Sequence, residues 1–136
     1  MKNILIICTA NKTRSVMAME IANHIAGKSG EYHFDSAGIA VMGNEIDLTA
    51  KRVLSEAGIE SVHVPTPLEG LNISGYDEIH VMTRRQKTAI CSFYGTPDIE
   101  GKIRILGIED PYGKGESAYH DCLETLKEYY EKFLNG

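Results

Sequence analysis

The sequence has 136 residues, with 14 basic and 19 acidic side chains and a formal net charge of −5. This length predicts one domain over residues 1–136, because a single core stops growing only beyond roughly 250 residues. The globular composition, 43% hydrophobic and 24% charged, excludes wholesale disorder, and the acidic balance argues against nucleic-acid binding. Three cysteines are too few for a disulfide scaffold. The first apolar run is too short for a leader or a membrane span, so we expect a reducing, cytoplasmic setting.

Strand patterns alternate with helix patterns along the chain. Strands are predicted at residues 3–8, 32–37, 78–82 and 102–106, and helices at 16–25, 47–57, 84–93 and 116–134, with an extended segment at 62–68. The alternation predicts an α/β fold built on a parallel sheet with right-handed crossovers. In such sheets the ligand site lies beyond the carboxyl ends of the strands. The loop after the first strand is therefore the first place to look for a site.

That loop begins with Cys8 at the end of the first strand and reaches Arg14 and Ser15 at the start of the first helix. A strand–loop–helix turn of this length can wrap its backbone N–H groups around one tetrahedral anion, helped by the positive end of the helix dipole. The arginine fork matches two phosphate oxygens, and such a field favours the nucleophilic thiolate of Cys8. The predicted anion-binding residues are Thr9, Ala10, Asn11, Lys12, Thr13, Arg14 and Ser15.

A thiolate that attacks phosphorus needs a general acid to protonate the leaving group. Asp110 follows the fourth predicted strand and is stiffened by Pro111. It is the preferred candidate, although Asp-Pro also simply initiates turns. Glu109 is the competing acid, and the sequence does not separate the two.

Taken together, these residues resemble the low-molecular-weight protein-tyrosine-phosphatase family along the whole chain. The family's Cys-x5-Arg-Ser loop corresponds to residues 8–15, and its Ser-Ala-Gly segment to residues 36–38. Its loop histidine corresponds to His63 and its late Asp-Pro-aromatic motif to residues 110–112. The resemblance implies a three-layer sandwich in which a four-stranded parallel sheet is flanked by helices, with no metal and no cofactor.

The resemblance also assigns roles to residues. Cys8 is implied as the nucleophile that forms a phosphocysteine, Arg14 as the phosphate-binding residue, and Asp110 as the acid. Tyr112 is implied as part of the pocket wall. The implied partner is a phosphorylated protein, with inorganic phosphate or other oxyanions as inhibitors and neither nucleic acid nor a membrane. A supporting hydrogen-bond network is implied for Asn11, Ser15, Ser36 and His63.

Three positions in the loop depart from the family pattern. Ala10 stands where glycine is usual, which predicts strain if that backbone needs a positive φ. Thr13 replaces the usual second cysteine, so we expect oxidation of Cys8 to be less reversible. Lys12 fits neither the apolar residue typical of tyrosine phosphatases nor the threonine of arginine phosphatases, and its charge should repel a guanidinium.

The sequence leaves the substrate open between two branches of the family. Phosphotyrosine comes first because of Lys12, and phosphoarginine second because Gly113, after Tyr112, resembles the arginine-phosphatase branch. An arsenate reductase would need a further cysteine pair, whereas Cys91 and Cys122 are more simply core thiols. A IIB-type phosphocarrier would lack Arg14 and Asp110. An inactive phosphate-binding module is the last alternative.

Overall fold

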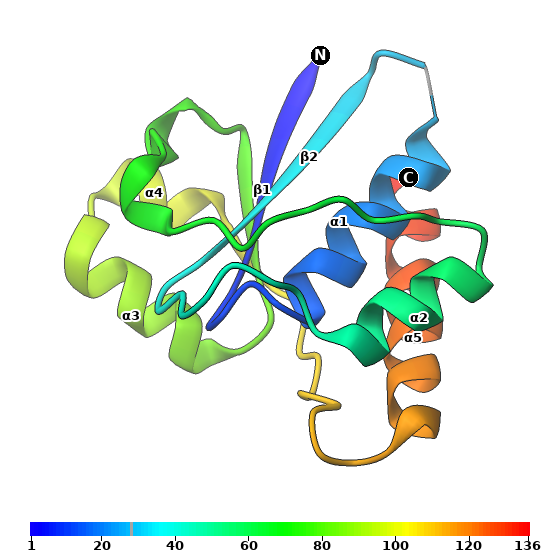
Figure 1. Cartoon of the computed structure of the whole chain (residues 1–136). Helices are drawn as coiled ribbons and strands as arrows, with labels where there is room; N and C mark the ends of the chain where they lie inside the picture. The colour runs from blue at the N-terminus through cyan, green and yellow to red at the C-terminus, as the bar shows by residue number, and fades with distance from the viewer. Residues whose placement is uncertain (28) are drawn as a thin grey trace.

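The computed structural model describes residues 1–27 and 29–136, and its elements alternate as the sequence predicts (Figure 1). The strands are β1 (Lys2–Cys8), β2 (Tyr32–Gly38), β3 (Glu78–Val81) and β4 (Ile103–Ile105). The α-helices are α1 (Arg14–Ala26), α2 (Leu48–Glu56), α3 (Arg84–Tyr94), α4 (Pro97–Lys102) and α5 (Glu116–Asn135). Two short 3₁₀ turns, Leu68–Gly70 and Ile73–Gly75, precede β3.

The four strands form one parallel sheet in the order β2-β1-β3-β4. Helices cover both faces, with α1, α2 and α5 on one side and α3 and α4 on the other (Figure 1). The predicted three-layer α/β fold with a four-stranded parallel sheet is therefore confirmed.

Strand β1 lies in the middle of the sheet and is apolar on both faces. Ile4, Ile6 and Cys8 belong to the core cluster shared with α1, α2 and α5, whereas Leu5 and Ile7 belong to the cluster under α3 and α4. A continuous apolar strand is typical of a parallel sheet buried on both sides. The alternation carries the Cys8 side chain to the face covered by α1, next to the start of that helix.

One helix, α4, has no counterpart in the predicted elements. Its start carries recognisable signals, because the Thr96 side chain accepts a hydrogen bond from the N–H of Ile99 and Pro97 takes the first helical position. It is only six residues long and follows α3 after two residues, so its apolar periodicity is too short to detect. None of the helices in the described part of the chain has the length and hydropathy of a membrane span.

Candidate active site

The loop after β1 turns sharply at Asn11, whose φ is +56°. It is the one non-glycine residue with a positive φ among those described, and asparagine tolerates this conformation better than most residues. Ala10 does not share it, so the strain expected at that position is not present. Within the described chain, no side chain caps α1 at Thr13, which leaves the first N–H groups of the helix available to an anion.

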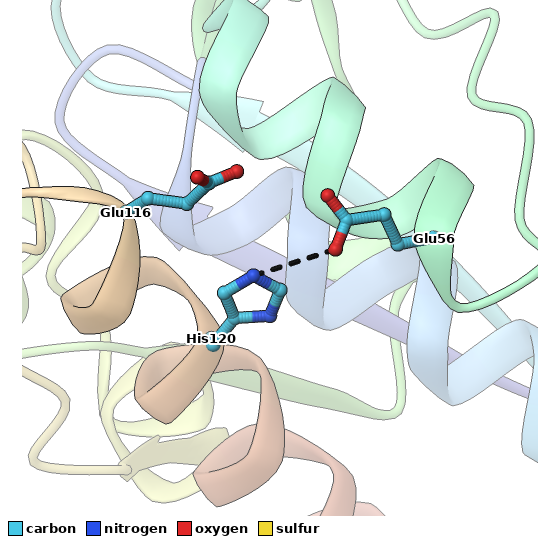
Figure 2. Close-up of side chains that lie close together, drawn as sticks. All are labelled: Glu56, Glu116 and His120. Carbon is cyan, nitrogen blue, oxygen red and sulfur yellow. Dashed lines mark ion pairs between the residues drawn. The ribbon is translucent and has the colours of Figure 1, made fainter.

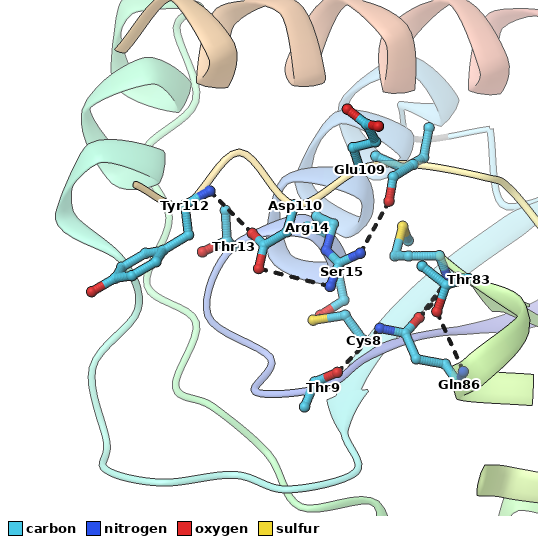
Figure 3. A network of polar contacts seen from close by, with 12 residues as sticks. Cys8, Thr9, Thr13, Arg14, Ser15, Thr83, Gln86, Glu109, Asp110 and Tyr112 are labelled. Carbon is cyan, nitrogen blue, oxygen red and sulfur yellow. Dashed lines mark hydrogen bonds and ion pairs between the residues drawn. The ribbon is translucent and has the colours of Figure 1, made fainter. Parts of the chain in front are cut away.

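Two hydrogen-bonding groups lie against the sulfur of Cys8, a residue that is 3% exposed. The Ser15 hydroxyl is 2.9 Å from Sγ (Figure 3). The backbone N–H of Asn11 donates to Sγ at 3.3 Å. Hydrogen bonds to sulfur stabilise its anionic form, whether as a nucleophile or as a leaving group.

The Asn11 side chain links the loop to three other segments. Its Nδ2 donates to Ser15 Oγ at 2.7 Å and to Ser36 Oγ at 3.0 Å. Its Oδ1 accepts from His63 Nε2 at 2.8 Å and from the N–H of Thr66 at 2.9 Å. Burial lowers the pKa of His63, which favours a neutral ring. The structure thus brings together Asn11, Ser15, Ser36 and His63. Both polar atoms of the Asn11 side chain are hydrogen-bonded, and these bonds hold Asn11 in its positive-φ conformation.

Gly38, at the end of β2, lets the loop lie directly against the sheet. A Cβ at this position would come within 2.9 Å of the Thr9 carbonyl oxygen and 2.8 Å of Val41. The next residues brace the loop from the same side, because the N–H of Ile39 donates to the Cys8 carbonyl and that of Ala40 to the Thr9 carbonyl. Glycine is required here by close approach rather than by φ.

We therefore expect Gly38→Ala to displace the loop. Forcing a methyl group against backbone costs about 1–3 kcal/mol of unfolding free energy, and turnover of an aryl phosphate should fall roughly tenfold or more. Urea unfolding and steady-state kinetics measure the two effects. Gly101→Ala is the matched control because nothing lies within 4 Å of its added Cβ. Equal behaviour of the two variants would contradict the requirement for glycine at position 38.

Arg14 joins the loop to the segment after β4. Its Nη1 donates to the Ile108 carbonyl at 3.0 Å, and its Nη2 lies 3.9 Å from Asp110 Oδ2 (Figure 3). The guanidinium is largely buried, so the charge is held at one place. One side chain therefore positions both the anion site and the acidic segment.

The two candidate acids point in different directions. The Asp110 carboxylate lines the cavity that contains Cys8 and accepts a hydrogen bond from the N–H of Tyr112. The Glu109 side chain is 91% exposed, lies 3.7 Å from Lys114 and does not line that cavity. Tyr112 lines the cavity and remains 73% exposed.

A cavity of about 560 Å³ opens over the loop. Besides the predicted site residues, Glu45, Ile46 and Asp47 line it, and none of these three was predicted from the sequence to belong to the site. Gln86 was also missed. This residue lies in the first turn of α3 and is buried. Its Nε2 donates a hydrogen bond to Thr9 Oγ1 at 3.3 Å (Figure 3). The Thr83-x-x-Gln86 capping-box pattern predicts the start of α3 but not the contact of Gln86 with Thr9.

The two remaining cysteines lie on opposite faces of the sheet. Cys122 is buried in the cluster of α1 and α5, and burial raises the pKa of its thiol to about 11. Cys91 is half-buried against the other cluster. The two thiols cannot pair across the sheet, so a disulfide relay between them has no structural basis.

A group of exposed side chains joins α2 to α5 away from the cavity (Figure 2). His120 Nε2 lies 3.4 Å from Glu56 Oε2, and Arg52 donates to Glu116 at 2.9 Å. The ligand atoms of Glu56, Glu116 and His120 come within 4.8 Å of one another, but all three residues are exposed and engaged in ion pairs. This arrangement is that of a surface ion-pair group rather than a built metal site.

Comparison with known proteins defines the class. The sequence model of the low molecular weight phosphotyrosine protein phosphatase family matches residues 3–136, and the chain belongs to this family. It is therefore a phosphatase of a family that hydrolyses phosphoric monoesters.

Its relatives divide between two substrate classes. A protein-arginine-phosphatase from Geobacillus stearothermophilus is 32% identical over 136 residues, which are 90% of this chain and 89% of the relative. The tyrosine phosphatase AmsI from Erwinia amylovora is 27% identical, with a TM-score of 0.86 over 98% of this chain and 91% of that one. A cysteine-to-serine mutant of the YwlE arginine phosphatase, with a phosphorylated active-site serine, is 26% identical, with a TM-score of 0.87 over 96% of this chain and 92% of that one.

Proposed function

We propose that this protein dephosphorylates proteins through a phosphocysteine intermediate on Cys8. The Cys8 thiolate attacks phosphorus, an S–P bond forms, and the bond to the leaving group breaks. Arg14 and the loop N–H groups hold the phosphoryl oxygens as charge develops on them. Asp110 gives its proton to the departing atom. The phosphorylated serine in the YwlE mutant supports this covalent step, because in that relative the residue at the active site carries the phosphoryl group.

The second step returns the enzyme to its starting state. Asp110, now ionised, takes a proton from water, the water oxygen attacks phosphorus, and the S–P bond breaks to release inorganic phosphate. The Ser15 hydroxyl, 2.9 Å from the sulfur, stabilises the departing thiolate. The observation that carries the proposal is the convergence of Cys8, Arg14 and Asp110 on one cavity.

We propose phosphoarginine as the first substrate class, which reverses the order expected from the sequence. The cavity is lined by three acidic residues, Glu45, Asp47 and Asp110, and two basic ones, Lys12 and Arg14, and the acidic residues other than the proton donor Asp110 are Glu45 and Asp47. Arg14 is directed to the phosphoryl group, so the remainder of the lining favours a substrate whose phosphoryl group is attached to a cationic guanidinium. The 32% identical relative, an arginine phosphatase, supports the same assignment.

Phosphotyrosine is the second candidate, on two observations. Tyr112 presents an exposed aromatic ring at the cavity, against which a substrate ring can pack. Lys12 also lines the cavity. Its ammonium nitrogen lies beside Gly43, at 3.4 Å from the position that a Cβ atom on Gly43 would take. The positive charge of Lys12 repels a cationic guanidinium but does not repel a neutral aromatic ring.

Side-by-side turnover of two peptides that differ only in phosphoarginine or phosphotyrosine tests the assignment. We expect kcat/KM to be roughly tenfold or more higher for phosphoarginine, and Lys12→Thr to widen that ratio by removing the opposing charge. A ratio in favour of phosphotyrosine would reverse the order of the two candidates. Failure to hydrolyse either peptide or an aryl phosphate would contradict the proposed function itself.

A further inference from the structure

We propose that Asp47 is a positioning residue that fixes the second half of the anion-binding loop, residues 12–14, for phosphate. This inference rests on the proposed function and adds a residue that is not among the predicted site residues. Asp47 is the N-cap of α2, since its Oδ1 accepts a hydrogen bond from the N–H of Thr49 at 2.9 Å. Its remaining polar atoms are engaged elsewhere.

The other carboxylate oxygen of Asp47 receives two hydroxyl groups. Thr13 Oγ1 donates to Oδ2 at 3.0 Å, and the hydroxyl of Tyr119, on α5, donates to the same atom at 2.5 Å. The backbone N–H of Asp47 donates to the Lys12 carbonyl at 3.0 Å. Asp47 thus holds two successive loop residues and is itself held by α2 and α5.

The Tyr119 contact is a strong one. Burial and the hydrogen bond to Asp47 raise the pKa of Tyr119, so the phenol keeps its proton and remains the donor. Hydrogen bonds from a hydroxyl to an ionised carboxylate are shorter and about twice as strong as those between neutral groups. The carboxylate therefore has a fixed orientation before any ligand arrives.

The loop needs such a support at this point. The Asn11 network fixes its first half, but Thr13 lies beyond that network with φ −128° and ψ −81°, in neither a helical nor a strand conformation. Thr13 is also the last residue before Arg14, whose N–H groups and guanidinium meet the phosphate in the proposed mechanism. A shift at Thr13 would therefore move these donors relative to the anion.

The contacts explain what Thr13 does in place of the cysteine usual in the family. Its hydroxyl donates a hydrogen bond to a carboxylate. A thiol would fill this role poorly because S–H is a weak donor. In this chain the position serves the geometry of the loop.

The test measures binding of inorganic phosphate by titration calorimetry, together with KM and kcat for an aryl phosphate. Tyr119→Phe removes one hydroxyl and leaves the cap of α2 and every loop residue in place. We expect it to weaken phosphate binding roughly 3- to 10-fold and to lower kcat/KM similarly. Tyr130→Phe is the matched control, because it removes another buried α5 hydroxyl, which lies 2.9 Å from His80 Nδ1. It should cost comparable stability and leave phosphate affinity unchanged.

A double-mutant cycle with Thr13→Val tests the link through Asp47. If Asp47 connects the two hydroxyls, the fold-loss of phosphate affinity in the double variant will be smaller than the product of the losses in the two single variants. Unchanged phosphate affinity in Tyr119→Phe, an equal loss in Tyr130→Phe, or fully multiplicative effects would each contradict the role of Asp47. A wild-type protein that binds phosphate without hydrolysing an aryl phosphate would contradict the proposed function alone.

Discussion

Replacing Cys8 with serine is expected to lower turnover of a small aryl phosphate by roughly 10⁴-fold or more, as loss of a catalytic nucleophile does. The serine hydroxyl is a far weaker nucleophile than a thiolate that receives two hydrogen bonds from Ser15 and Asn11. The backbone of the loop and Arg14 are untouched by this change. Affinity for inorganic phosphate should therefore stay within a few-fold of the wild-type value.

Steady-state kinetics, phosphate titration and urea unfolding of the Cys8→Ser protein check these expectations together. Cys91→Ser is the control, because that thiol is half-buried against the opposite face of the sheet and does not line the cavity. It should keep full turnover. Wild-type rates in Cys8→Ser would exclude the phosphocysteine mechanism, whereas an unfolded protein would show that Cys8 has a structural role.

The second large effect concerns the general acid. Asp110→Asn is expected to slow substrates with poor leaving groups by about 10²- to 10³-fold, because the departing atom no longer receives a proton. Aryl phosphates with good leaving groups need little protonation and should slow less than about tenfold. A plot of log kcat/KM against the pKa of the leaving group measures the difference as a change of slope.

Glu109→Gln is the control for this experiment. The Glu109 carboxylate is exposed and lies near Lys114, so its removal should leave the leaving-group slope unchanged. An equal loss for good and poor leaving groups in Asp110→Asn would indicate that the residue acts through its contact with Arg14 rather than as an acid. A changed slope in Glu109→Gln would assign the acid to Glu109.

The sheet could be predicted because each strand and each long helix carries a local signal. β1 is a continuous apolar run, and α5 places Tyr119, Leu123, Leu126 and Tyr130 on one buried face. The short helix α4 lacks such periodicity and was missed. The order of the strands and the packing of α2 against α5 depend on contacts between distant segments, which no local pattern encodes.

The site likewise contains residues that a local sequence pattern predicts and residues that only the folded chain brings together. The loop residues are adjacent in sequence and could be found as one motif. Asp47 and Gln86 act on that motif from α2 and α3, and their local signals are ordinary helix caps. What makes them part of the site is the second contact of each, to Thr13 and Thr9 respectively, which only the folded chain creates. The condition for strain at Ala10, a positive φ at that position, is not met because the positive φ falls on Asn11.

The covalent step on Cys8 is the central step of the proposed mechanism, and trapping the intermediate tests it most directly. The wild-type protein is mixed with a phosphoarginine peptide or an aryl phosphate and denatured within milliseconds. It is then cleaved, and the mass of the fragment that contains Cys8 is measured by mass spectrometry. We expect that fragment to carry one added phosphoryl group during turnover and to lose it when substrate is exhausted. Turnover without any phosphoryl group on Cys8, or with the group on another residue, would contradict the mechanism.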